Sequence, residues 1–246
     1  MLENEPLSLF KQAVMSILLL SPALAGADEW LDCIMEPNAR VNVSSEVPGI
    51  IEEMAVERGD RVSKGQAVVF LKSAAEKSAV ALAQAKLDFG LRKAQRSKDL
   101  VKKELISIDE MDELETENRI AELELEQAKE RLNMRMIKSP VDGVVVERLL
   151  SPGEYVNNEP ILNIASIDPL NVEVIVPVAR MGELRRGMTA EVMSEWPKDK
   201  RYRGKVVIVD PVADPASGTF GVRVELDNPR HRIPAGVKCQ VRFLNM

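Results

Sequence analysis

The chain has 246 residues, of which 45% are apolar and 4% aromatic, and its formal net charge at pH 7 is −6. This length fits one large domain or about two to three small ones, and the apolar content excludes a disordered chain. Acidic and basic residues are interspersed without a lysine or arginine block, which argues against a nucleic-acid-binding protein. The scarcity of aromatic residues disfavours an enzyme with an aromatic-lined pocket.

Residues 1–25 have the pattern of a secretory signal peptide. Lys11 precedes a mostly apolar run over 13–20, and residues 21–25 supply the small side chains of a cleavage site. The run is shorter than the roughly 20 residues needed to span a bilayer. We expect cleavage after residue 25 or Ala27 and a mature protein in the periplasm. The acidic residues before Lys11 leave an uncleaved anchor or a misplaced start codon as alternatives.

Export would allow the two cysteines, Cys33 and Cys239, to form a disulfide in an oxidising compartment. Cys239 alternates with Val241 and Phe243 in the final strand, so its side chain points inward and can meet an N-terminal strand that carries Cys33. The bridge would close about 205 residues and stabilise the fold by roughly 4 to 5 kcal/mol. The alternative is a pair of buried free thiols.

Two segments of the chain repeat one pattern at an offset of 94 residues. Each copy has two glycines ten residues apart and a valine three residues further on: Gly49, Gly59 and Val62, then Gly143, Gly153 and Val156. We expect the glycines at turns where the backbone takes positive φ. Because neither copy can bury its apolar face alone, the repeat predicts that residues 41–73 pair with residues 136–165 around one core.

Residues 74–135, between the two copies, predict an antiparallel helical hairpin. Both proline-free stretches, from Ser73 to about Lys103 and from Ile108 to Arg135, favour helices of roughly 40 to 45 Å. Apolar or small residues recur at spacings of three and four and predict a narrow seam for one partner helix. The seam positions are Val80, Ala83, Leu87, Ala94 and Val101 in the first helix, and Met111, Leu114, Asn118, Ala121, Leu125, Ala128 and Leu132 in the second.

The link between the helices places three large aliphatic residues, Leu105, Ile106 and Ile108, at the exposed end of the hairpin. An exposed apolar cluster of this kind often marks a contact surface. Ser107, followed three residues later by Glu110, predicts a capping box that opens the second helix.

Residues 166–246, together with 26–40, predict a small antiparallel β-barrel. Short segments of alternating apolar residues lie at 172–176, 188–192, 206–209 and 222–226, and turn residues separate them. The predicted fold class is therefore mainly β, with an α-helical hairpin inserted into a split β domain and a barrel beside it.

The paired copies resemble a biotinyl/lipoyl-type domain, a lipoyl-like barrel-sandwich hybrid. Their split by a helical hairpin resembles the membrane fusion proteins, the HlyD-like periplasmic adaptors. Lipoyl and biotinyl carriers present a modified lysine between their halves, whereas a long insert stands there in this chain, which disfavours a carrier subunit. The segment 209–220, with Asn228-Pro229 and 233–236, resembles the adaptor β-barrel. Adaptors of the RND (resistance-nodulation-division) type usually add a membrane-proximal domain after that barrel, so docking on a pump is expected to differ here.

RND-type adaptors share a sparse motif at the hairpin tip, and Arg96, Leu100 and Ser107 fit its spacing, with Asp112 at a further acidic position. The resemblance implies that these residues meet an outer-membrane channel. Each also has a local alternative: Ser107 as a helix cap, Leu100 as hairpin core and Arg96 as a solvated charge.

The resemblance implies a periplasmic adaptor of a tripartite efflux system that assembles into a homo-oligomeric ring. It would link an inner-membrane transporter, with the RND type favoured, to the outer-membrane channel. An adaptor of an ABC-type exporter and a non-transport envelope scaffold are the alternatives. The only histidine is His231, and no residues have the spacing of a metal site, a cofactor site or a catalytic group, so we expect no enzyme.

Overall fold

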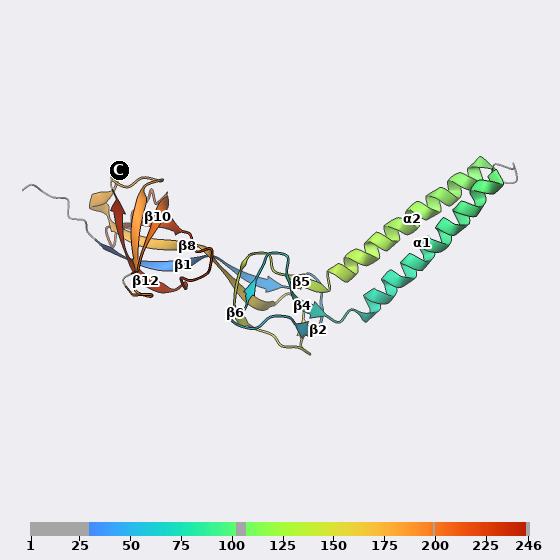
Figure 1. Cartoon of the computed structure of the whole chain (residues 1–246), viewed down its shortest axis with the longest axis horizontal. Coiled ribbons are helices and arrows are strands. Elements are labelled where there is room, and N and C mark those ends of the chain that lie inside the picture. The colour runs from blue at the N-terminus through green and yellow to red at the C-terminus, as the bar shows by residue number, and fades with distance from the viewer. Residues whose placement is uncertain (1–29, 102–106, 199, 245–246) are drawn as a thin grey trace, which may run out of the picture.

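The computed structural model describes residues 30–101, 107–198 and 200–244, which form three modules in a row (Figure 1). A barrel module lies at one end, a second β module lies in the middle, and a helical hairpin projects from the side of that module opposite the barrel. Strands dominate and two helices form the hairpin, so the predicted fold class is confirmed. The predicted signal peptide lies outside the described residues.

The barrel module is a closed ring of six antiparallel strands. In order around the ring they are β1 (Leu31–Ser44), β12 (Val237–Leu244), β9 (Thr189–Ser194), β10 (Lys200–Val209), β11 (Thr219–Leu226) and β8 (Pro160–Pro177). The ring closes because β1 pairs with both β12 and β8. Alternate residues of β8, such as Val172 and Val174, point into a core built from all six strands. A short 3-10 helix, Val178–Arg180, follows β8.

Two long strands join the barrel module to the middle module. β1 has 14 residues and β8 has 18, and they pair with each other through both modules. Their register shifts between Pro37 and Ala39, where the β1–β8 pair leaves the barrel, and again between Val43 and Ser44. Because the same two strands belong to both cores, the modules share a covalent and hydrogen-bonded connection.

The middle module, called here the sandwich module, is built by strand exchange between the two sequence repeats. Its further strands are β2 (Gly49–Met54), β3 (Arg61–Val62), β4 (Ala67–Leu71), β5 (Met136–Lys138), β6 (Gly143–Arg148) and β7 (Tyr155–Val156). Gly49 pairs with Val156, and the equivalent Gly143 pairs with Val62. Each repeat therefore completes the sheet of the other, and both valines are buried in one core, as the repeat predicts.

The four repeat glycines serve two different purposes. Gly59 and Gly153 adopt φ values of 95° and 94°, the left-handed conformation expected of them. For Gly49 and Gly143 this expectation was wrong, because neither adopts positive φ. A Cβ atom on Gly143 would lie 2.9 Å from the carbonyl carbon of Ala165, and one on Gly49 would lie 2.7 Å from the guanidinium of Arg135. Gly143 needs glycine because the backbone of β8 approaches closely, whereas at Gly49 the Arg135 guanidinium would have to move to make room for a Cβ atom.

A disulfide joins Cys33 of β1 to Cys239 of β12. The two residues lie directly opposite each other in the antiparallel pair, with their Cα atoms 4.9 Å apart. Both are buried in the barrel core. The disulfide therefore closes the barrel between its first and last strands in the chain, and the alternative of two free thiols is absent from this structure.

The hairpin consists of α1 (Ala74–Val101) and α2 (Ile108–Asn133). Six of the seven predicted seam residues of α2 are buried: Met111, Leu114, Asn118, Ala121, Leu125 and Ala128. In α1, Leu87 and Ala94 are buried opposite them. Gly90 brings the α1 backbone against the carboxamide of Asn118, where a Cβ atom would clash. Within the described part of the chain, no helix combines the length and apolarity needed to cross a membrane.

Candidate functional site

The tip of the hairpin presents apolar side chains from both helices. Leu100, near the end of α1, is 38% exposed, and Ile108, the first residue of α2, is 72% exposed. Leu100 is therefore not part of the hairpin core, which was one of its two interpretations. Leu105 and Ile106 lie between these two residues in the chain but outside the described residues. The described part of the tip already offers an apolar surface.

Ser107 caps α2. Its Oγ accepts a hydrogen bond from the backbone N–H of Glu110 at 3.1 Å, and its own backbone is extended, with φ −79° and ψ 162°. This is the serine half of the predicted capping box. The cap fixes where α2 begins, so it also fixes the direction in which Ile108 leaves the tip.

Arg96 lies exposed on α1, one turn before Leu100. Among the described residues, no hydrogen bond or ion pair involving its guanidinium is found. It follows the buried residue Ala94 by two positions, about 200° around the helix, so it points away from α2. The structure thus leaves Arg96 on the outside of the hairpin and available to a partner.

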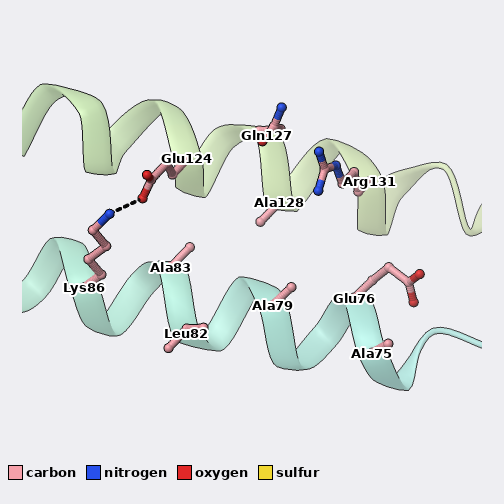
Figure 2. A pocket seen from close by; sticks show the side chains of 10 residues that line it. All are labelled: Ala75, Glu76, Ala79, Leu82, Ala83, Lys86, Glu124, Gln127, Ala128 and Arg131. Atoms are coloured by element: carbon pink, nitrogen blue, oxygen red, sulfur yellow. Dashed lines mark hydrogen bonds and ion pairs between the residues drawn. The ribbon is translucent and has the colours of Figure 1, made fainter.

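A groove runs along one flank of the hairpin near its base (Figure 2). It has a volume of about 640 Å³. Ala79, Ala83 and Ala128 point into it, and the ion pair between Lys86 Nζ and Glu124 Oε2, at 2.7 Å, crosses it. Sequence analysis missed this groove, although the alanines at 75, 79 and 83 recur every four residues and therefore share a face of α1.

The base of the hairpin is fastened to the sandwich module by Arg135. Its guanidinium donates to Glu76 Oε1 at 2.6 and 2.9 Å and to the carbonyl oxygen of Pro48 at 2.7 Å. One side chain thus ties the end of α2 to the start of α1 and to the strand that begins at Gly49. The Glu76 backbone N–H and then the Arg135 guanidinium hold the pKa of Glu76 below its ordinary value of 4.5, against the opposing effect of burial. Sequence analysis missed this contact because the two charges are far apart in the chain.

Comparison with protein families agrees with this architecture. Residues 39–166 match the model of a CzcB-like, barrel-sandwich hybrid domain, and residues 170–246 match that of a CusB-like, beta-barrel domain. The first match alone covers more than half of the chain. This chain belongs to the membrane fusion protein family.

Several relatives of this membrane fusion protein are similar over most of its length. An uncharacterized protein of Haemophilus influenzae is 22% identical over 87% of this chain and 58% of its own length. The antibiotic efflux pump periplasmic linker protein ArpA of Pseudomonas putida is 23% identical over 82% of this chain and 58% of its own length. The chain thus spans less than two thirds of the length of these relatives.

A solved structure shares the fold of this membrane fusion protein. It is a MacA-MexA chimeric protein that contains the Pseudomonas aeruginosa MexA alpha-hairpin domain. The TM-score is 0.71 at 22% sequence identity, and the match covers 87% of this chain and 78% of the chimera. In the part of the chain described here, no group of three or more His, Cys, Asp or Glu residues is arranged to hold a metal ion.

The base of the hairpin in this membrane fusion protein is expected to weaken in acid. The pKa of Glu76 is lowered by folding, so its contribution to stability is present above 4.5 and is lost as the pH falls through the lowered value. We expect Glu76→Gln to reduce the free energy of unfolding by about 1–2 kcal/mol at neutral pH, because the Arg135 guanidinium loses a charged acceptor. Below the lowered pKa, variant and wild type converge. Denaturant unfolding followed by circular dichroism across this pH range measures the difference.

Glu124→Gln is the matched control for Glu76→Gln. Its carboxylate pairs with Lys86 in the same hairpin, but both side chains are largely solvent-exposed. An exposed pair of this kind contributes about 0.5 kcal/mol. A Glu76→Gln variant with the same small and pH-independent effect would contradict the role given to Glu76.

Proposed function

We propose that this protein is a periplasmic adaptor of a tripartite efflux system. In this role it links an inner-membrane transporter, with the RND type favoured, to an outer-membrane channel through the hairpin tip. The observation that carries the proposal is the length of the hairpin and the apolar surface at its tip. α1 has 28 residues, which corresponds to about 42 Å of helix, and the tip of the hairpin carries exposed apolar side chains. Such a projection positions a contact surface at a distance from the β modules.

The chemistry of the described tip suits a protein partner. Leu100 and Ile108 offer apolar area, and Arg96 offers a charge with five N–H donors for carbonyl or carboxylate acceptors. Ser107 holds the start of α2 in place through its cap. A large part of the binding energy of an interface comes from a few apolar and arginine side chains of this kind. We place the channel contact on Arg96, Leu100, Leu105, Ile106 and Ser107.

The disulfide supports a location in the periplasm. Cys33 and Cys239 are paired in the barrel core, and disulfides persist in oxidising compartments but are rare in the cytosol. The relative ArpA is named as a periplasmic linker protein of an antibiotic efflux pump. We infer that this chain is held at the inner membrane by its partners and assembles there into a ring. Its action is contact and sealing rather than catalysis.

The proposal is tested by crosslinking in intact cells. A photoreactive residue is introduced at position 105, and the captured partner is identified by mass spectrometry. We expect capture of an outer-membrane channel. In the same background Leu100→Asp should reduce the yield about tenfold, because it places a charge in the apolar centre of the contact.

A photoreactive residue at Ile175 serves as the control. Ile175 is an exposed side chain of the barrel module, at the opposite end of the molecule from the tip. Equal capture of the channel from both positions, or capture from position 105 that Leu100→Asp leaves unchanged, would refute docking through the tip. Capture from the tip of only unrelated envelope proteins would favour the scaffold instead.

A further inference from the structure

The groove at the base of the hairpin has an apolar middle and charged side chains at both ends (Figure 2). Ala79, Ala83 and Ala128 point into its middle, and Leu82, which is 74% exposed, also lines it. Its volume of about 640 Å³ lies within the range of roughly 300–1,000 Å³ that is typical of small-molecule sites. The groove is therefore large enough for a small organic molecule and apolar enough to hold its hydrophobic part.

Three of the four charged side chains that line the groove are compensated within the chain. Lys86 Nζ and Glu124 Oε2 form an ion pair at 2.7 Å across the groove. Glu76 accepts two hydrogen bonds from the Arg135 guanidinium, at 2.6 and 2.9 Å. Arg131 is the fourth charge, and within the described part of the chain no hydrogen bond or ion pair of its guanidinium is found. The groove thus keeps one uncompensated positive charge.

Arg131 lies at the opposite end of the groove from the ion pair. It follows Ala128 by three positions, so the two side chains share a face of α2. Seven residues of α2 separate Glu124 from Arg131, so the two ends lie about 10 Å apart along the helix. Figure 2 shows Ala79, Ala83 and Ala128 between these ends. The shape and charge of the groove suit an elongated apolar molecule with one acidic group.

We propose that the groove binds a small amphiphilic anion, a molecule with an elongated apolar body and one carboxylate or sulfonate group. The apolar body covers the alanines and Leu82 and displaces water from them. The acidic group accepts hydrogen bonds from Arg131, whose planar guanidinium matches two oxygen atoms of a carboxylate. The site needs no second copy and no transporter. The inference therefore goes beyond the proposed adaptor role and does not rest on it.

An amphiphilic cation is the competing ligand, because α2 as a whole is acidic, with ten aspartate or glutamate residues and three basic ones. The two carboxylates that line the groove, however, are held by Lys86 and Arg135. A cation would have to displace one of these partners to reach a carboxylate, whereas an anion reaches Arg131 without breaking either ion pair. Charges elsewhere on α2 act more weakly, because salt screens exposed charges over about 8 Å at physiological ionic strength.

Binding is tested by isothermal titration calorimetry of the purified full-length protein with decanoate, below the concentration at which decanoate forms micelles. Acetate, which has the acidic group alone, and decyltrimethylammonium, which has the same chain and the opposite charge, are the comparison ligands. We expect saturable binding of decanoate at one site, and about tenfold weaker binding or none for both comparison ligands, because each lacks one of the two contacts. Equal binding of the cation, or equal binding of acetate, would overturn the inference.

Arg131→Gln tests the contact with the acidic group. We expect it to weaken decanoate binding about tenfold, because the ligand loses its charge-assisted hydrogen bonds, and Arg131→Lys should restore part of the affinity. Lys129→Gln is the matched control, since it removes the same charge two positions away, about 200° around α2, and should leave the affinity unchanged. Equal losses in Arg131→Gln and Lys129→Gln would show a general effect of charge and contradict a contact at Arg131.

Ala79→Phe tests the groove itself. Ala79 is exposed, so a phenyl ring can fill the groove without entering the hairpin core. We expect Ala79→Phe to abolish decanoate binding while thermal unfolding followed by circular dichroism stays unchanged. Ala81→Phe places the same ring two positions further on, at an exposed residue outside the groove, and should bind decanoate normally. Binding that survives Ala79→Phe, or that Ala81→Phe abolishes equally, would place the ligand elsewhere and refute the site.

Discussion

Replacing both Cys33 and Cys239 with alanine is expected to reduce the free energy of unfolding of the barrel by about 4 to 5 kcal/mol. The disulfide joins β1 to β12, the strands that close the ring, across a sequence separation of 206 residues. Without the bond, the unfolded chain regains the freedom to separate its two ends, and that gain in entropy favours unfolding. Denaturant unfolding of the oxidised and reduced wild type and of the double variant measures the loss.

The control for cysteine removal is Val241→Ala. Val241 is fully buried in the same strand as Cys239, two residues further on, and its truncation removes apolar volume from the same core. We expect a loss of about 1–3 kcal/mol that reductant leaves unchanged. The double cysteine variant should instead lie close to the reduced wild type. A reduced wild type within about 1 kcal/mol of the oxidised form would contradict the role given to the disulfide.

Features with a short period in the sequence were predictable. The seam of α2 follows from spacings of three and four, and the structure buries those positions from Met111 to Ala128. The pairing of the two repeats follows from their shared pattern, because two similar short segments need each other to bury their apolar faces. Both predictions use local patterns, which the sequence displays directly.

The two sequence repeats also share a serine position that sequence analysis missed. Ser45 and Ser139 are also 94 residues apart, and both are buried. Each hydroxyl donates to the carbonyl oxygen two residues later, at 2.5 Å to Val47 and 2.6 Å to Val141. Buried serines with this local bond turn the chain where each repeat begins. The matching serines extend the repeat and could have been found by comparing the two copies position by position.

Other parts of the site could not be predicted from a local pattern. Arg135 reaches Glu76 across 59 residues of chain, and nothing in the residues around either charge indicates the other. The close approaches at Gly49 and Gly143 depend on which strand or side chain arrives from elsewhere. The outward position of Phe89 on α1 is visible only once the seam is known, because the outer side of the helix is defined by the buried side opposite it. Contacts of this kind are set by tertiary packing.

Replacing Asn228 with alanine is expected to destabilise the barrel module by about 3 kcal/mol, because it leaves four buried or partly buried backbone groups without this partner. The side chain amide of Asn228 donates to the carbonyl oxygens of Ile167 and Ile233, at 2.9 and 2.8 Å. Its carbonyl oxygen accepts from the N–H groups of Arg232 and Ile233, at 3.0 and 3.1 Å. This one side chain joins the turn between β11 and β12 to the middle of β8, where the paired strands β1 and β8 pass from the barrel module to the sandwich module.

The variant Asn228→Asp tests the two hydrogen bonds that Asn228 donates separately from the two that it accepts. The carboxylate still accepts from the two N–H groups, but its second oxygen faces two carbonyl oxygens, so the variant should be at least as unstable as Asn228→Ala at neutral pH. Burial beside these acceptors raises the pKa of the introduced carboxyl, so its stability should recover as the pH falls towards that raised value and a proton restores one donor. Asn163→Ala, which removes one bond to an exposed Glu147 carboxylate, should cost about 1 kcal/mol or less without this recovery. Equal losses at Asn163 and Asn228 in thermal unfolding would show that Asn228 fills space and does not hold the turn.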